Sequence, residues 1–172
     1  YTMVYGIAKM LNFAHGDIIM VGAYSVIVSA VTLKLPPIVA ILIAVVVCAA
    51  LGVTIEFLAY RPLRQSPPLA VLITAIGVSY LLQNLALLIF GPEQKSTPAL
   101  FDLPSLTLGG VTVDGITLLT LGVTAAIMVG LTLFINLTRM GKAMRAVSED
   151  RDAAELMGIS VNKTITITFA IG

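Results

Sequence analysis

The sequence has few charged residues. They make up 11% of the chain, against roughly 25% in ordinary globular domains, whereas apolar residues make up 58%. The net charge is +1 at pH 7, so the composition gives no electrostatic reason to expect nucleic-acid binding. Since a soluble domain of 172 residues has too little interior to hide this much apolar sequence, the composition predicts an integral membrane protein.

Residues that build catalytic and metal sites are also scarce. The chain has one histidine and one cysteine, which are too few for a histidine-based metal site and exclude an internal disulfide. No nucleophile motif accompanies His15 and Asp17, and no glycine-rich loop followed by lysine is present to hold a phosphate. We therefore expect no catalytic residues, no metal and no cofactor. If the protein works with ATP, a separate chain hydrolyses it.

The charges that are present lie in short connectors. Nine of the nineteen lie between residues 139 and 163. The uncharged segments, which we interpret as membrane spans, cover residues 18–33, 35–55, 69–90 and 115–138. At about 1.5 Å per residue, the second of them gives a helix of about 31 Å, close to the ~30 Å thickness of the hydrocarbon layer. The segments lack the alternation of outer-membrane strands, so the predicted fold is all-α, a polytopic helical bundle.

The two ends of the chain are apolar as well. Residues 1–8 are typical of the end of a preceding span, and residues 164–172 of the first turns of a following one. The sequence does not begin with methionine. We therefore expect a fragment of a single transmembrane domain, truncated at both ends.

Basic residues in short loops mark the cytoplasmic side of a membrane protein. The connector 56–64 holds Arg61 and Arg64, and the connector 139–163 holds five basic residues. Residues 92–114 hold one basic residue and three acidic ones. The first two connectors are therefore predicted to be cytoplasmic and the third external.

Two connectors carry further local signals. Residues 106–113, LTL-GG-VTV, predict a short β-hairpin, because two glycines supply the positive φ that its turn needs. Tyr60, at the border of an apolar segment, is interpreted as an interfacial anchor.

Small residues recur at every fourth position in two of the apolar segments. Such stripes allow helix backbones to approach closely in lipid. We interpret them as contacts inside the bundle, with pairing between subunits as the alternative. The stripes are Ala40, Ala44, Cys48 and Gly52, and Gly122, Ala126 and Gly130.

Several polar residues lie beside or inside the apolar segments. The segment from Asn12 to Asp17 precedes a segment that is short for a full crossing, which favours a broken or short helix near the N-terminus. Broken helices present backbone N–H groups to substrates, whereas a surface loop that caps a helix at Asp17 is the other interpretation. Amides inside a span either bond to another helix or line a path. The candidate substrate-path residues are Asn12, His15, Gly16, Asp17, Gln83 and Asn84.

A short helix is predicted in the connector 139–163. Ser148 can cap it, Glu149 and Asp150 favour its N-terminal end, and Gly158 supplies a left-handed stop. It is too short to cross a membrane. A compact helix with small residues on one side fits a groove on another protein, whereas a solvated connector is the alternative.

Six segments of the chain resemble the branched-chain amino acid permease family of ABC importers. The segments are RMGKAMRAV at 139–147, DAAELMGI at 152–159, MLNFAHGD at 10–17 with VGAY at 21–24, AYRP at 59–62 and ITAIG at 73–77. The first two resemble the cytoplasmic loop of importer permeases, and the resemblance covers almost the whole chain.

The resemblance implies an importer in a bacterial inner or plasma membrane. Its expected parts are two permease subunits, the second a distinct homologue, two cytoplasmic ATPases and an external substrate-binding protein. The loop helix would be the coupling helix that docks on an ATPase. Asp152 stands where many importers have glutamate. The implied coupling residues are Asp152, Ala153, Ala154, Glu155, Met157, Gly158 and Ile159.

The substrate class remains open at this stage. Branched-chain amino acids are the expectation from the family, with other amino acids, urea and short amides as alternatives. An ion-coupled secondary transporter or a channel is a different class, in which Asp17 or Glu56 would carry the coupling charge. Dependence of uptake on ATP or on an ion gradient separates these classes.

Overall fold

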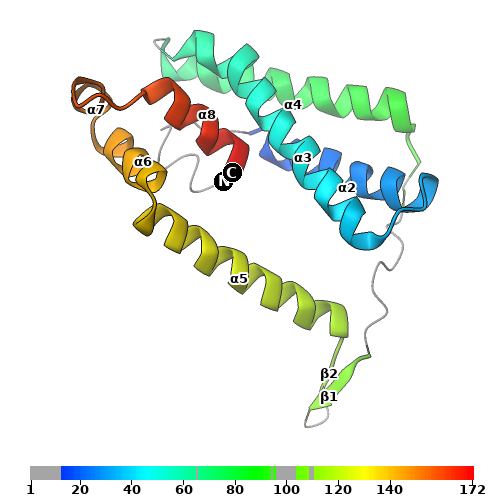
Figure 1. Cartoon of the computed structure of the whole chain (residues 1–172). Helices are drawn as coiled ribbons and strands as arrows, with labels where there is room; N and C mark the ends of the chain where they lie inside the picture. The colour runs from blue at the N-terminus through cyan, green and yellow to red at the C-terminus, as the bar shows by residue number, and fades with distance from the viewer. Residues whose placement is uncertain (1–12, 65, 94, 96–103, 109–110) are drawn as a thin grey trace.

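The structure is a computed structural model that describes residues 13–64, 66–93, 95, 104–108 and 111–172. The predicted partial span at residues 1–8 therefore lies outside the described residues. The elements follow one another in the order shown in Figure 1. They are α2 (His15–Ile27), the π-helix η1 (Val28–Thr32), α3 (Pro37–Ile55), the π-helix η2 (Glu56–Tyr60), the 3-10 helix η3 (Arg61–Leu63), α4 (Pro68–Phe90), β1 (Leu106–Leu108), β2 (Val111–Val113), α5 (Gly115–Leu137), α6 (Arg139–Glu149), α7 (Arg151–Leu156) and α8 (Val161–Ile171).

Four helices in the described part are long and apolar enough to cross a membrane. They are His15–Thr32, Pro37–Leu63, Leu69–Phe90 and Gly115–Leu137. The second continues eight residues past the uncharged segment that ends at Ile55, because Glu56 lies inside the helix and not in a connector. The chain is thus a polytopic helical membrane protein.

Proline and glycine set the ends of two of these helices. Pro37 and Pro68 occupy the first turns of α3 and α4, where the missing N–H costs no hydrogen bond. Helix α4 ends at Gly91, whose φ of 78° lies in the left-handed region that glycine tolerates best. The two predicted strands are confirmed, and they pair antiparallel with Leu106 opposite Val113.

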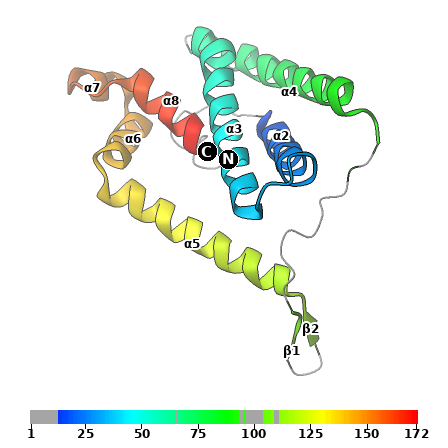
Figure 2. The ribbon, with the colours of Figure 1, turned by 45° about the vertical axis from the view of Figure 1, so that its right-hand side comes forward.

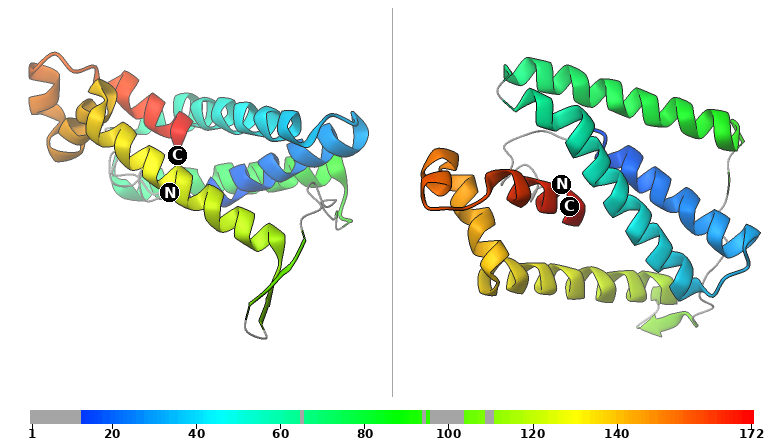
Figure 3. Two further views of the ribbon diagram at one scale, coloured as in Figure 1. Left: turned by 60° about the horizontal axis from the view of Figure 1, so that its bottom comes forward. Right: turned by 45° about the horizontal axis from the view of Figure 1, so that its top comes forward.

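The connectors gather at two opposite ends of the helices. In Figures 1 and 2, η2, η3, α6 and α7 lie at one end, and the turn after η1, the end of α4 and the hairpin lie at the other. Both views in Figure 3 show the same separation. We name the first the basic end, because it holds Arg61, Arg64 and the basic residues of segment 139–163.

The buried core lies close to the basic end. Its members come from the residue before α2, the end of α3, η2, the first two-thirds of α4, and α6, α7 and α8, and they include Ile55, Val71, Val147, Ala154 and Ile165. Tyr60 is fully buried there, with its ring 5.3 Å from that of Phe169. The interpretation of Tyr60 as an interfacial anchor was therefore wrong, because a long-range ring contact takes it into the core.

The small-residue stripe of α3 faces the interior, as predicted. Ala40, Ala44 and Gly52 are buried. A Cβ atom added at Gly52 would lie 2.6 Å from the backbone oxygen of Phe169 in α8. Only glycine therefore allows α3 and α8 to approach this closely, and the stripe serves packing within the bundle.

The stripe of α5 behaves differently. Gly122 and Gly130 have open space where a Cβ would stand, and Ala126 is exposed. Among the described helices α5 packs mainly against α6, and Figure 2 shows it apart from α2, α3 and α4. Within the described residues, the stripe of α5 therefore makes no close helix contact of the kind that was predicted inside the bundle.

Candidate functional site

A buried carboxylate joins α2 to α4. Asp17 lies in the first turn of α2 and is 8% exposed. Ser79 donates a hydrogen bond to its Oδ2, and Gln83 Nε2 donates to its Oδ1 at 3.0 Å. Gln83 Nε2 also lies 3.2 Å from Ser79 Oγ. Both oxygens of the carboxylate are thereby satisfied within an apolar helix interface, which is what a charge at membrane depth requires.

The cluster of Asp17, Ser79 and Gln83 argues against the interpretation of Asp17 as a residue of a surface loop. Asp17 lies inside α2 and is buried against α4. Its place on a substrate path stays a prediction. The sequence reasoning missed Ser79. Its position one turn before Gln83, on the same face of α4, is the signal that was available.

The other candidate path residues do not join this cluster. Asn12 lies outside the described residues. His15 lines an apolar cavity of about 410 Å³ between α2, α3 and α8, and Gly16 is exposed. Asn84 is exposed and donates to the carbonyl of Tyr80 in its own helix at 2.7 Å. Of the five candidates that the structure describes, it brings together Asp17 and Gln83.

A second polar cluster ties the basic end together. Glu56 is fully buried and forms an ion pair with Arg64. Arg64 also donates to Asn162 Oδ1, and Thr166 Oγ1 donates to Glu56 Oε2 at 2.8 Å. Both of these partners belong to α8. The cluster therefore fixes the start of α8 to the end of α3.

Burial and charge act on the guanidinium of this cluster in opposite directions. Burial lowers the pKa of Arg64, and the neighbouring Glu56 carboxylate raises it. An arginine stays protonated in proteins. The ion pair is therefore expected to persist over the pH range in which the carboxylate is ionised.

The short helix predicted in the connector 139–163 is present, but it begins at a different residue. Two helices, α6 and α7, replace one, with a break at Asp150. Asp150 Oδ1 caps α7 by accepting from the N–H groups of Asp152 and Ala153 at 2.9 and 3.0 Å. Ser148 is no cap, since its hydroxyl donates back to Arg145. The predicted stop is confirmed, because Gly158 has a φ of 82°.

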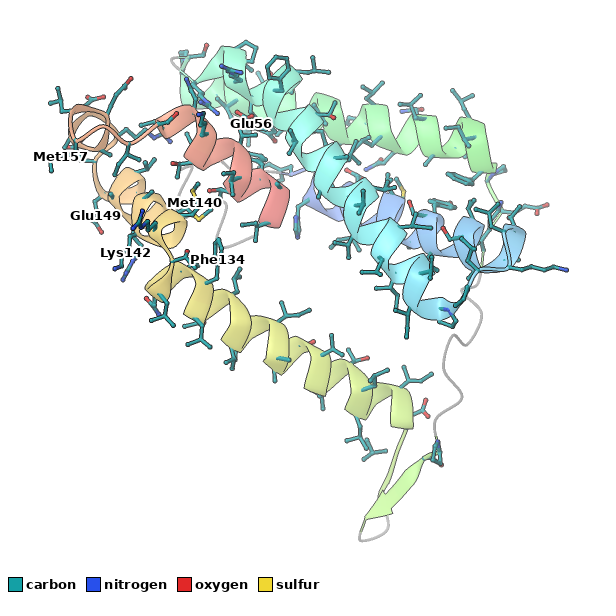
Figure 4. The ribbon with its side chains drawn as sticks, in the orientation of Figure 1. Glu56, Phe134, Met140, Lys142, Glu149 and Met157 are labelled. Atoms are coloured by element: carbon teal, nitrogen blue, oxygen red, sulfur yellow. The ribbon has the colours of Figure 1, made fainter. Side chains whose placement is uncertain are left out.

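The residues of α7 and its stop divide into a buried and an exposed group. Ala154 is 4% exposed and belongs to the core cluster, against which the half-buried Ile159 also packs. Leu156 and Met157 are 89% and 83% exposed, and Figure 4 shows Met157 at the outer edge of the basic end. The remaining coupling candidates, Asp152, Ala153, Glu155 and Gly158, are exposed.

Leu156 was absent from the coupling residues expected from sequence. It is the most exposed large apolar side chain at the basic end. Two residues along a helix rotate a side chain by about 200°, so Leu156 points away from the core that Ala154 enters. Helix α7 therefore packs against its own bundle through the side that carries Ala154, and the side that carries Leu156 is open to a partner.

Comparison with known proteins gives a consistent picture. The family described as branched-chain amino acid transport system / permease component matches residues 1–172. The high-affinity branched-chain amino acid transport system permease protein BraD of Pseudomonas aeruginosa is 40% identical over 184 residues, covering 100% of this chain and 60% of BraD. The LivH permease proteins of Salmonella typhimurium and Escherichia coli K12 are 38% and 37% identical, with the same two coverages. No solved structure matches.

Proposed function

Since the chain belongs to the branched-chain amino acid transport permease family, we propose that it forms the core of a membrane-spanning subunit of an ATP-driven importer. The chain spans about 60% of the length of the curated relatives that it matches. The proposed cargo is branched-chain amino acids, and the proposed site is the bacterial inner membrane. ATP would be hydrolysed on separate subunits, so this chain supplies no catalytic residue and holds no cofactor.

One structural observation supports this proposal most directly. Helix α7 is capped at both ends, is held to the bundle by Ala154, and exposes Leu156 and Met157. An apolar tip on a rigid short helix at the basic end has the form needed to enter a groove on a cytoplasmic protein. We assign that partner as an ATPase subunit.

The expected route of the mechanical signal follows from the contacts. A movement of α7 reaches α8 through the short segment between them. Helix α8 is fixed to α3 by the hydrogen bonds of Asn162 and Thr166 to the Glu56–Arg64 pair and by the close approach at Gly52. The apolar helices would therefore move as rigid bodies between outward- and inward-open states when the ATPases close.

The orientation of the chain follows from its charges. The basic end would face the cytoplasm, as the distribution of lysine and arginine favours. The hairpin end, with the β1–β2 pair and the end of α4, would face outward, where a substrate-binding protein delivers the cargo. A second permease subunit, a distinct homologue, and the lipid bilayer would cover the exposed apolar surfaces such as α5.

The substrate path is proposed to pass the Asp17 cluster. A buried carboxylate held by two hydrogen-bond donors of another helix is costly unless it serves packing specificity or a polar route. The cluster lies between α2 and α4, and Gln83 also lines a cavity that opens toward the hairpin end. His15 lines the separate apolar cavity between α2, α3 and α8, so the proposed path does not include it.

Dependence on ATP is the test of the proposed class. The full-length protein is reconstituted in vesicles with its partner permease, ATPases and binding protein. We expect uptake of labelled leucine only with ATP on the side of α7. Uptake that follows an ion gradient without ATP would contradict the importer. The neutralising contact of Glu56 with Arg64 already disfavours Glu56 as a coupling charge.

A substitution tests the proposed path. Asp17→Asn removes the charge from two hydrogen bonds, each of which is worth about 1.5–3 kcal/mol when one partner is charged. We expect leucine uptake in the reconstituted system to fall by about tenfold. Asn84→Ala is the matched control, because among the described residues Asn84 donates its hydrogen bond within its own helix. Equal uptake in both variants and wild type, with normal assembly, would remove Asp17 from the path.

The same reconstituted vesicles can test the alternative substrates. Urea, short amides and other amino acids are tested by replacing leucine and its binding protein. A family member that carried urea would need no site for two opposite charges, whereas an amino acid carries both.

A further inference from the structure

A cavity of about 560 Å³ lies at the hairpin end between α2 and α4. This volume is within the range of about 300–1,000 Å³ that small-molecule sites occupy. Met20, Ala86 and Leu87 form part of its wall, and Gln83 brings in the amide that bonds to Asp17. The cavity is therefore an open site of mixed character, with apolar residues of α2 and α4 on part of its wall and a larger share of polar surface, to which Gln83 contributes.

The rim of the cavity carries one charge of each sign. Glu93 and Lys95 both line it, from the segment that follows α4. Within the part of the chain that the structure describes, the two side chains form no ion pair with each other. A carboxylate and an ammonium group are thus both presented to whatever enters.

Two aromatic rings position the ammonium group. Tyr24 of α2 stacks on Phe90 of α4, with ring centroids 4.0 Å apart and an angle of 7° between the planes. The Lys95 Nζ lies 5.4 Å from the centroid of Phe90, within the range of a cation–π interaction. The stacked rings join both walls of the cavity and hold Lys95 at its rim.

We propose that this cavity is an outer subsite for the zwitterionic form of an amino acid, and this inference rests on the proposed transport function. Lys95 would bind the carboxylate and Glu93 the α-ammonium group by charge-assisted hydrogen bonds. Met20, Ala86 and Leu87 would take the aliphatic side chain, with methionine adapting to its shape. The Gln83 amide would be the next polar contact on the way inward.

The proposal selects between the substrate classes left open by the sequence. An uncharged amide or urea leaves both rim charges without a partner, and an anion or a cation leaves one. Glu93 and Lys95 are exposed, so each missing partner forfeits one solvent-exposed charged contact and weakens binding modestly. A zwitterion with an aliphatic side chain is the class that uses the whole cavity.

Equilibrium binding tests the subsite without the binding protein. Labelled L-leucine is titrated onto the full-length permease complex with its ATPases. We expect saturable binding that unlabelled leucine displaces and that isovaleramide and 4-methylpentanoate do not. Glu93→Gln and Lys95→Gln should each weaken binding by about fivefold, the effect of losing one solvent-exposed charged contact. Lys34→Gln is the matched control, because Lys34 is an exposed external-end lysine outside the cavity.

Three results would overturn the subsite. They are the absence of saturable leucine binding to the wild type, equal displacement by isovaleramide, and unchanged affinity in both rim variants. If the rim variants instead weaken only the association with the binding protein, the two charges belong to that protein contact. The exchanged variant, Glu93→Lys with Lys95→Glu, keeps both charges and should bind leucine better than either single variant. Gel filtration checks that all of these variants assemble. ATP-dependent uptake by the wild type stands as a separate result, so the subsite can fail while the importer function holds.

Discussion

Replacement of Leu156 with glutamate is expected to abolish ATP-dependent uptake while the protein still inserts and folds. Leu156 is 89% exposed and adds nothing to the core, so its loss does not weaken the bundle. Full burial of a leucine in a partner is worth about 1.5–3 kcal/mol, and a carboxylate in the same groove adds the cost of an unpaired charge. Uptake in reconstituted vesicles and co-purification of the ATPase measure the effect.

Two controls accompany Leu156→Glu. Glu149→Gln alters an exposed residue of α6 that is not among the coupling candidates, and it should leave uptake close to wild type. Ala154→Arg should instead lower the amount of folded protein, because Ala154 is buried in the core; its effect on uptake therefore says nothing about docking. Full uptake and normal co-purification in Leu156→Glu would remove this side chain from the ATPase contact.

Removal of Arg64 is expected to cause the largest loss of stability. Arg64→Met leaves the fully buried Glu56 carboxylate without its ion pair, a change that costs about 3–5 kcal/mol when one partner of a buried pair is removed. Thermal or denaturant unfolding in detergent measures the change. Combined with Glu56→Leu, the same substitution should recover most of the loss, because no buried charge remains.

Arg61 provides the comparison in the same connector. It is exposed, and its guanidinium carbon lies 5.2 Å from the centroid of the Phe57 ring. Arg61→Met should cost about 1 kcal/mol or less. Equal stability of Arg64→Met and Arg61→Met would show that the Glu56 cluster does not hold α8 to α3.

The positions of the helices could be predicted from the sequence, because the length of each apolar segment and short local motifs determine where a helix begins and ends. The apolar segments, the prolines at the starts of α3 and α4, the hairpin strands and the stop at Gly158 act within a few residues. The boundary at Glu56 was different. The sequence prediction ended the apolar segment before Glu56 because that residue is charged. In the structure the Glu56 carboxylate is bound by Arg64, 8 positions away, and by Thr166, 110 positions away, and Arg64 also bonds to Asn162.

The candidate site was less predictable for the same physical reason. The partner of Asp17 in α4 is 62 residues away in sequence, and no local spacing identifies it. Position 156 was missed because spacing alone does not say which face of a short helix the protein itself covers. The burial of Ala154 decides this point.

An importer driven by ATP requires the tip of α7 to touch an ATP-hydrolysing subunit. Its most direct test is a Met157→Cys variant in a Cys48→Ala background, which leaves one reactive cysteine in the described chain. A short bifunctional reagent is applied to the full-length protein in its assembled transporter, and the adducts are identified by mass spectrometry. We expect position 157 to link to the ATPase. Labelling of that cysteine from the external side, with no adduct to an ATPase, would contradict it.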